Sequence, residues 1–248
     1  MQNLTEIALQ MSPDGVFTRQ EVGCWLGGSP DRQFGLLRRS LRAGEVLRIH
    51  RGLYCLAPKY LRRKVDLLIL AQRIHGPSYI SLESALSYHG WIPEAVYAVT
   101  SVALDRSREF DTPVGYFSFT RVPQQALYTE VARVETGPTG SFLLAEPLKA
   151  LADYVYVHKC DWTTVGPLVG SLRIDDDLLA GIEPEPFDRL LVNYSSRRVR
   201  RFLDGLRKEI FGDRPRSRVT PPCVSNKARS YREKKTVPLA PTHGESCP

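Results

Sequence analysis

Two helix-start signals on either side of a double glycine constrain the fold more than any other feature. Thr18-Arg-Gln-Glu21 has the form of a capping box, in which the hydroxyl and the carboxylate each satisfy an early backbone amide. Gly27-Gly28 ends that helix, and Ser29-Pro30-Asp31 opens the next one with an N-cap, a first-position proline and an early acid. The second helix runs to about Ala43, because Gly44 supplies a C-terminal stop. The segment therefore predicts two short helices joined by a tight turn.

A further helix precedes this pair and a hairpin follows it. Residues 3–11 carry apolar side chains at helical spacing, and the turn at residues 12–15 ends that helix. Val46–His50 alternates like a strand, Arg51-Gly52 can turn, and Leu53–Leu56 returns. Three helices followed by a basic hairpin is the order of a winged helix-turn-helix. In that fold the third helix enters the major groove of DNA and the wing lies along the phosphate backbone.

The basic side chains of this segment are the candidate DNA-binding residues. On the third helix, Phe34, Leu37 and Leu41 are expected to share the inward face, with the arginines roughly opposite. Arg48 and His50 are expected on one face of the first hairpin strand, because side chains repeat every two residues. An arginine-rich helix is also typical of a solvated surface, but its place in this order of elements favours DNA. The predicted contacts are Arg32, Gln33, Arg38, Arg39 and Arg42 on the helix, and Arg48, His50 and Arg51 in the wing.

Charge is distributed unevenly along the chain, whose net charge is +7. Residues 1–65 contain 11 Lys and Arg against 5 Asp and Glu, whereas residues 66–185 contain 8 against 16. This pattern indicates a basic nucleic-acid-binding end joined to a body with another task. From residue 212 onward Pro, Ser, Lys and Arg dominate, which is typical of a disordered basic tail. We therefore divide the chain into a winged helix at 1–65, a second domain at 66–211 and a tail at 212–248.

The middle of the chain reads as a mixed α/β domain closed by carboxy-terminal helices, which makes the whole chain α+β. A short helix is expected within residues 79–90, and another from Glu146-Pro147 onward with its apolar side facing inward. Arg197-Arg-Val-Arg-Arg201 makes the last helix strongly basic, which fits either a second phosphate contact or a solvated surface. The expected strands are Val96–Leu104, Tyr116–Phe119, Leu127–Val134 and Phe142–Ala145, and the closing helices are Phe187–Tyr194 and Arg197–Ile210.

Several motifs in this middle region are similar to those of one family. They are Tyr79-Ile-Ser-Leu-Glu-Ser-Ala-Leu-Ser-Tyr-His-Gly-Trp-Ile-Pro-Glu94 and Ala145-Glu-Pro-Leu-Lys-Ala-Leu-Ala-Asp153, with Leu47–Tyr54 upstream and Leu172-Arg-Ile-Asp175 downstream. With these motifs the chain resembles the AbiEi-type antitoxins, the regulatory halves of type IV toxin–antitoxin (abortive infection) operons. The likeness covers residues 15 to about 210, and the 79–94 run is its most specific part.

The resemblance implies a protein with two roles. Its winged helix would bind the DNA of its own operon and repress it, and its second domain would counteract a nucleotidyltransferase-like toxin. The toxin carries the transfer chemistry in such operons, and the motifs leave open whether neutralisation needs direct contact. The motif residues of unassigned role are Ser81, Glu83, Ser84, His89, Lys149 and Asp153.

Taken without the family, these motif residues mostly favour architecture. Ser81 is expected to cap a helix, and His89 has no partner at ligand or triad spacing. Lys149 and Asp153 are four residues apart on one helix, which predicts a surface ion pair rather than a catalytic couple. Asp175-Asp-Asp177 lacks the glycine and distal glutamate of a calcium loop and is expected to link two helices.

The sequence favours a binding protein over an enzyme. It contains no phosphate-binding loop, zinc-protease motif or serine-hydrolase elbow, and it predicts no cofactor or metal. One catalytic alternative is a metal-dependent nuclease built from Glu135, Glu146 and Lys149, although the spacing of the last two departs from an acid-x-lysine arrangement on one strand. An orphan winged-helix regulator and a pure interaction module are further alternatives.

The expected cellular setting follows from what the sequence lacks. The first residues do not form a secretory signal, and no apolar run reaches the length of a membrane span. The five cysteines form no CxxC pair and indicate no disulfide framework. These features predict a cytoplasmic protein with no membrane partner.

Overall fold

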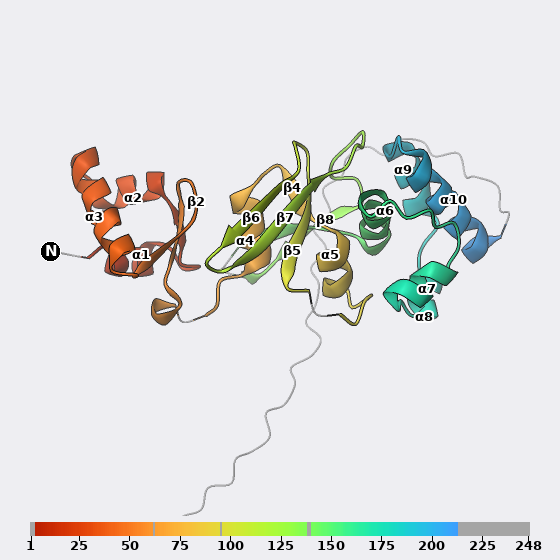
Figure 1. Ribbon diagram of the computed structural model, residues 1–248, viewed down its shortest axis with the longest axis horizontal. Helices are drawn as coiled ribbons and strands as arrows, with labels where there is room; N and C mark the ends of the chain where they lie inside the picture. Colours follow the sequence, from red (N-terminus) through yellow and green to blue (C-terminus); the bar gives the residue numbers. More distant parts are fainter. Residues whose placement is uncertain (1–2, 62, 95, 138–139, 213–248) are drawn as a thin grey trace, which may run out of the picture. The chain divides into compact units, whose positions relative to one another are not determined.

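The computed structural model describes residues 3–61, 63–94, 96–137 and 140–212, which form a mixed α+β fold (Figure 1). Apart from Gly212, the predicted tail lies outside the described residues. No helix in the described part of the chain is long and apolar enough to cross a membrane.

The amino-terminal helices begin and end where the capping signals predict. Thr18 Oγ1 accepts a hydrogen bond from Glu21 N at 3.2 Å, and the Glu21 carboxylate accepts one from Thr18 N at 2.6 Å. Ser29 Oγ accepts from the backbone amide of Arg32 at 3.4 Å. Gly27 and Gly28 both have positive φ, +57° and +74°, which glycine adopts without a Cβ penalty. The elements are α1 (Leu4–Met11), α2 (Arg19–Leu26), α3 (Pro30–Arg42), β2 (Val46–His50) and β3 (Leu53–Leu56).

A short strand that the sequence did not reveal, β1 (Val16–Thr18), completes this segment. It pairs antiparallel with β3, so the small sheet has the order β1-β3-β2. Three residues are too few to show a strand's alternation, and the pairing partner lies almost forty residues further along the chain.

Both faces of this small sheet are covered. Phe17, Tyr54 and Leu56 pack with α1, α2 and α3 in one apolar cluster. Val16, Ile49, Leu53 and Cys55 belong instead to the large core formed by the rest of the chain. The small sheet therefore lies between two hydrophobic cores and contributes side chains to both. An ion pair adds to the connection, because Arg73 Nη1 lies 2.8 Å from the carboxylate of Asp14.

The larger sheet has six strands in the order β6-β7-β5-β4-β9-β8. The pairs β5–β7 and β4–β9 are parallel and the other neighbours are antiparallel. Two strands were not predicted: β6, and β4, whose residues were expected to begin a helix. The bounds are β4 (Ser78–Ile80), β5 (Ala98–Ala103), β6 (Arg108–Thr112), β7 (Gly115–Arg121), β8 (Val131–Glu135) and β9 (Ser141–Ala145).

Helices surround the larger sheet (Figure 1). On α6, the predicted inward residues Leu148, Leu151, Ala152 and Val155 are all buried. The aspartates at 175–177 were expected to form a linker, but Asp175 is an N-cap and the next two open a helix, as acids near a helix amino terminus favour. The bounds are α4 (Leu67–Ile74), α5 (Leu82–Tyr88), α6 (Pro147–Val157), α7 (Gly166–Leu172), α8 (Asp176–Ala180), α9 (Glu185–Asn193) and α10 (Arg197–Phe211), with a 3-10 turn at Pro58–Tyr60.

Candidate nucleic-acid interface

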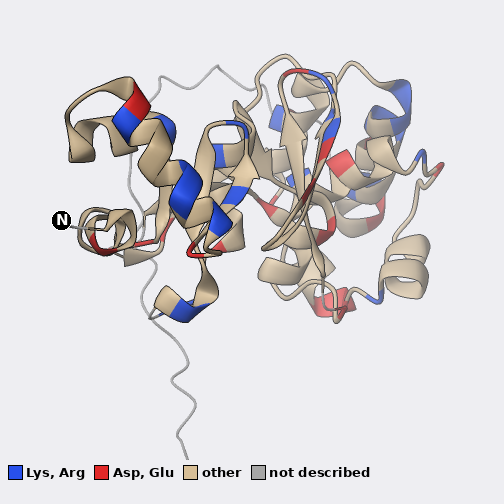
Figure 2. Ribbon diagram, turned by 60° about the vertical axis from the view of Figure 1, so that its left-hand side comes forward, with Lys and Arg blue, Asp and Glu red and all other residues tan. Residues whose placement is uncertain are grey.

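Helix α3 presents a row of arginines to solvent (Figure 2). The inward stripe of the helix consists of Gln33, Leu37, Ser40 and Leu41, at the i, i+4, i+7, i+8 spacing of a packed helix face. The side chains at Arg32, Arg38, Arg39 and Arg42 are exposed. Among the described residues, none of these four guanidiniums lies within ion-pair distance of an acid. The face is therefore positively charged and free to meet an anion.

Phe34 does not lie on the inward face where the sequence placed it. Its side chain is 51% exposed, and the guanidinium of Arg19 lies 5.7 Å from the centre of its ring. The inward stripe runs through Gln33 and Leu37, which leaves Phe34 at the edge of the packed surface. The prediction of a Phe34-Leu37-Leu41 face is thus wrong at its first member.

The side chain of Gln33 points from α3 toward the end of α2 and the α2–α3 turn rather than outward. Its Nε2 lies 3.3 Å from the carbonyl oxygen of Gly23, 3.2 Å from that of Gly27 and 3.3 Å from that of Gly28. The side-chain amide therefore bridges the end of α2 and the glycine turn, and it shares the Gly23 carbonyl with the backbone amide of Gly27. Gln33 fixes the start of α3 against the end of α2.

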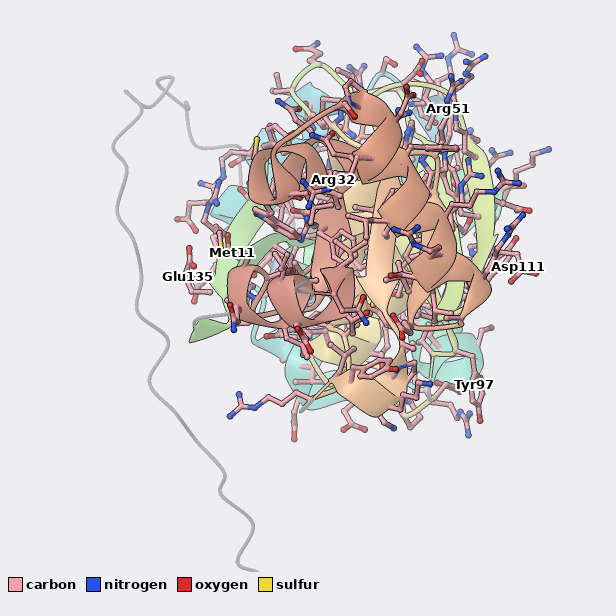
Figure 3. The ribbon with its side chains drawn as sticks, turned by 90° about the vertical axis from the view of Figure 1, so that its left-hand side faces the viewer. Met11, Arg32, Arg51, Tyr97, Asp111 and Glu135 are labelled. Carbon is pink, nitrogen blue, oxygen red and sulfur yellow. The ribbon has the colours of Figure 1, made fainter. Side chains whose placement is uncertain are left out.

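In the hairpin, Arg48 and Arg51 are exposed while His50 is half-buried; Figure 3 labels Arg51 together with Arg32 of α3. The register of β2 against β3 shifts between Arg48 and His50, so the strand contains a bulge. A bulge interrupts the two-residue alternation, and the expectation that Arg48 and His50 share a strand face is not met. Instead, the His50 ring packs edge-on against Phe110 of β6, with 5.0 Å between ring centres.

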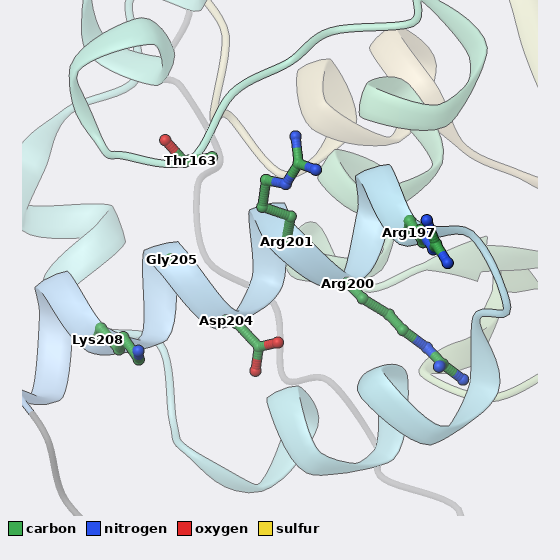
Figure 4. Close-up of a pocket in the computed structure, with 7 residues that line it drawn as sticks. All are labelled: Thr163, Arg197, Arg200, Arg201, Asp204, Gly205 and Lys208. Carbon is green, nitrogen blue, oxygen red and sulfur yellow. The ribbon is translucent and has the colours of Figure 1, made fainter.

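A second group of basic side chains lies on α10 and divides into two sets. Arg198 pairs with Asp161 at 3.1 Å, Arg200 Nε donates to the carbonyl oxygen of Tyr194 at 2.6 Å, and Arg207 pairs with Asp188. The side chains of Arg197, Arg201 and Lys208 have no such partner among the described residues and line a pocket of about 460 Å³ (Figure 4). The first set fixes the fold, and the second set can bind an anion.

One glycine sets the distance between α10 and the loop that faces it across this pocket (Figure 4). A Cβ at Gly205 would lie 2.1 Å from the carbonyl oxygen of Thr163, closer than any real contact. Only glycine allows the loop to approach the helix this closely.

The motif residues Lys149 and Asp153 are not a surface ion pair. Both side chains are 0% exposed, because α6 packs between the sheet and the last two helices. Asp153 accepts hydrogen bonds from Tyr79 Oη at 2.8 Å, Ser81 Oγ at 2.7 Å and Tyr194 Oη at 2.5 Å. Ser81 occupies the predicted N-cap position of α5, but its side chain makes this bond to Asp153 and no cap hydrogen bond. The carboxylate joins β4, α6 and the end of α9.

Lys149 lies beside this carboxylate network. Its ammonium donates to Gln124 Oε1 and lies 4.5 Å from the centre of the Tyr194 ring. Burial lowers the pKa of Lys149, and the negative charge of Asp153 partly opposes that shift. Burial also raises the pKa of Tyr79 and of Tyr194 well above the ordinary value, and Asp153 adds to both shifts.

The remaining motif residues tie α5 to its surroundings. Glu83 accepts a hydrogen bond from His158 Nε2 at 2.9 Å, and His89 Nε2 lies 2.9 Å from the carbonyl oxygen of Ala145. Ser84 Oγ accepts from Thr100 N at 2.8 Å and donates to the carbonyl oxygen of Ala98 at 3.1 Å. The 79–94 segment is thus fastened to β5, β9 and α6.

The three residues of the nuclease alternative lie in different surroundings. Glu135 is exposed on β8, Glu146 is the half-buried N-cap of α6, and the amine of Lys149 is directed at Gln124. Within the described residues, no group of three or more His, Cys, Asp or Glu side chains is arranged to hold a metal ion. The geometry gives this alternative no support.

The comparison with known families matches the segment that carries the exposed arginines. Residues 7–57 match the family model described as "Transcriptional regulator, AbiEi antitoxin", which spans the elements from α1 to β3. No curated protein matches the chain. The family match confirms the resemblance to AbiEi-type antitoxins over this amino-terminal segment.

Proposed function

We propose that the chain is the antitoxin and autorepressor of a type IV toxin–antitoxin operon. Residues 1–65 act as a winged helix-turn-helix that binds the DNA of its own promoter. Residues 66–211 form the antitoxin domain that counteracts a nucleotidyltransferase-like toxin. One observation carries the DNA-binding role: six exposed arginines, none paired with an acid among the described residues, lie in the segment that matches a regulator family. They are Arg32, Arg38, Arg39, Arg42, Arg48 and Arg51.

The two sets of arginines have different tasks in this proposal. Helix α3 has 13 residues, about 20 Å of helix, which fits the major groove of B-form DNA. Arg39 and Arg42 would contact base edges, because a guanidinium forms two hydrogen bonds with the O6 and N7 atoms of guanine. Arg48 and Arg51 of the wing would contact phosphates, which adds affinity without reading sequence. Gln33 holds α3 at its angle to α2 without touching DNA.

The antitoxin domain is proposed to act by binding and not by catalysis, with no cofactor. Its motif residues make hydrogen bonds within the domain. Asp153 accepts from three hydroxyls, Ser84 bonds to β5, and His89 lies against a carbonyl of β9. Side chains with such internal hydrogen bonds stabilise the shape of a binding surface and do not take part in catalysis. Whether the toxin is contacted directly or opposed through a shared target is an outcome for experiment.

The DNA-binding role is tested by gel shift of the full chain on duplex DNA from the region upstream of its gene. Arg39→Ala with Arg42→Ala should abolish the specific shift, because each bidentate base contact contributes about 1–3 kcal/mol of discrimination. Arg106→Ala is the matched control, since this exposed arginine lies on the acidic body. An unchanged shift in the double variant would exclude α3 as the reading helix.

The wing is tested by the salt dependence of the same binding. Loss of one phosphate contact should lower the slope of log affinity against log salt by about one. Arg48→Ala and Arg51→Ala should each do so on operator and on unrelated DNA alike. A loss confined to the operator would instead make the wing a sequence reader.

The antitoxin role is tested by co-expression with the nucleotidyltransferase-like protein encoded beside the gene. Growth should be rescued by the full chain and by the Arg39→Ala, Arg42→Ala variant, because repression and neutralisation lie in different domains. Rescue that fails while the operator shift persists would leave an orphan regulator. Rescue with no operator shift from the full chain would leave an interaction module.

A further inference from the structure

A pocket on the body is built largely by the 79–94 motif and lies outside the segment assigned to DNA. Its volume is about 450 Å³, within the range of ligand sites. Its lining includes Glu83 of α5, Ile92, Glu94 and Tyr97 of the loop that follows, Tyr154 of α6 and Leu172 of α7. Three segments that are distant in sequence thus meet at one concave surface.

Two carboxylates give this pocket its charge, and each already has a side-chain partner. Glu83 pairs with His158 at 2.9 Å and Glu94 pairs with Arg173, whose side chain is 64% exposed. The hydrogen bond from Arg173 lowers the pKa of Glu94. Burial raises the pKa of Glu83, but the hydrogen bond from His158 and its neighbours outweigh burial, so the pKa of Glu83 is lowered too. Both acids are therefore negatively charged at neutral pH.

Aromatic rings lie beside these carboxylates. Tyr154 stacks with His158, 4.1 Å between ring centres, and with Trp162, 5.8 Å between ring centres. Tyr97 is 93% exposed (Figure 3) and makes no ring contact with the described residues. Tyr97 lines the same pocket as Glu83 and Glu94, and the face of a tyrosine ring attracts a cation.

The floor of the pocket is apolar. Ile92 and Leu172 are buried there, 7% and 8% exposed. An aliphatic stem that ends in a cation matches such a lining, because the stem covers hydrocarbon while the charged head reaches the acids and rings. Guanidinium adds planar, forked hydrogen bonding to carboxylates and stacking on aromatic faces. The lining therefore selects arginine and lysine side chains.

The charge of the surrounding body indicates what presents that side chain. Residues 66–185 contain 16 acids against 8 Lys and Arg, a field that repels nucleic acid and attracts a basic protein surface. We propose that this pocket docks an arginine or lysine side chain presented by a partner protein. The proposal goes beyond DNA binding and does not depend on it.

The test uses the full ¹⁵N-labelled chain and three probes in an NMR titration. The first is the peptide acetyl-Leu-Arg-Leu-amide, the second replaces arginine by citrulline, which has the same shape but no charge, and the third is free agmatine. The arginine peptide should give saturable shifts at the amides of Glu94 and Thr100 and bind about tenfold more tightly than the citrulline peptide, as a charge-assisted contact implies. Equal binding of the two peptides would overturn the proposal. Agmatine binding as tightly as the peptide would exclude a protein source and indicate a free small cation.

Variants then locate the site. Glu94→Gln and Tyr97→Ala should each weaken the arginine peptide by about fivefold or more, in line with a lost charged or cation–π contact. Glu135→Gln and Tyr128→Ala remove an exposed acid and a half-exposed ring elsewhere, and should leave binding unchanged. Because Tyr97 is almost fully exposed, its variant is expected to fold normally. Undiminished binding by Tyr97→Ala, or equal weakening by the control variants, would place the peptide elsewhere. The operator gel shift should be the same for all four variants, which separates this proposal from the DNA-binding one.

Discussion

The hydroxyl of Tyr194 donates a 2.5 Å hydrogen bond to the carboxylate of Asp153, and both side chains are fully buried. Tyr194 is the C-cap of α9, which directly precedes α10, and Asp153 lies in the middle of α6. Two more hydroxyls converge on the same carboxylate, from Tyr79 and Ser81. A single acid thus connects the sheet to the closing helices.

Replacing this acid should be far more costly than replacing one of its partners. Asp153→Ala leaves three buried hydroxyls without an acceptor and is expected to lower the free energy of unfolding by about 3–5 kcal/mol. Tyr194→Phe removes one donor and should lower it by about 1–2 kcal/mol. Urea denaturation followed by circular dichroism measures both. A loss for Asp153→Ala no larger than that for Tyr194→Phe would show that the hydroxyls find other partners.

Lys149 should make stability depend on pH. Because burial lowers its pKa in the folded state, the unfolded chain binds more protons as pH approaches the ordinary lysine pKa from below, and the free energy of unfolding rises with pH there. Lys149→Met keeps the length of the side chain and removes the titration. The stability difference, wild type minus variant, should therefore be larger at pH 9.5 than at pH 7. A difference that is the same at both values would mean that the lysine has an ordinary pKa.

Gly205 and Gly35 offer a matched pair of glycine replacements within helices. A Cβ at Gly205 would overlap the Thr163 carbonyl, whereas a Cβ at Gly35 of α3 would meet nothing within 4 Å. Gly205→Ala should lower the free energy of unfolding by about 1–3 kcal/mol through overpacking. Gly35→Ala should raise it by up to about 1 kcal/mol, since alanine favours helix. Thermal melting of the two variants gives the sign of each change, and two changes of equal sign would contradict the close approach at Thr163.

Gln33 should affect operator binding through geometry and not through charge. Gln33→Ala removes the side-chain amide that bonds the carbonyls of Gly23, Gly27 and Gly28, and is expected to cost about 1–2 kcal/mol of stability. With α3 less firmly held, operator affinity should fall while its salt slope stays at the wild-type value, because no phosphate contact is lost. Gel shifts over a series of salt concentrations measure both. A reduced slope would place Gln33 on the DNA backbone instead.

Local sequence signals predicted the amino-terminal helices well. Strands that depend on partners far away in the sequence were not predicted. The capping residues Thr18 and Ser29 act within three residues of themselves, so the sequence alone contains their partners. Strand β6 pairs with the next strand, β7, across the tight turn between Thr112 and Gly115, so its partner is local. Strands β1 and β4 have three residues each and exist because of strands that pair with them from distant parts of the chain. Secondary-structure patterns cannot supply such partners.

The candidate site shows the same division between local and distant causes. The exposed arginines of α3 follow from helical spacing, but Gln33 was placed outward because its three carbonyl partners belong to the preceding turn. Its position in the i, i+4, i+7, i+8 stripe with Leu37 and Ser40 was the signal that could have placed it inward. The burial of Lys149 and Asp153 had no such signal, because Tyr79, Ser81 and Tyr194 lie 74, 72 and 41 residues from Asp153.

The small sheet β1-β3-β2 has apolar side chains packed against both of its faces. Unfolding of the larger α/β part alone would expose Val16 and Leu53 to water. Unfolding of α1, α2 and α3 alone would expose Phe17 and Tyr54. We therefore expect residues 3–61 and the larger α/β part of the chain to unfold in one cooperative transition under heat or denaturant. For the proposed antitoxin, this coupling means that unfolding would remove toxin neutralisation and repression of the operon together.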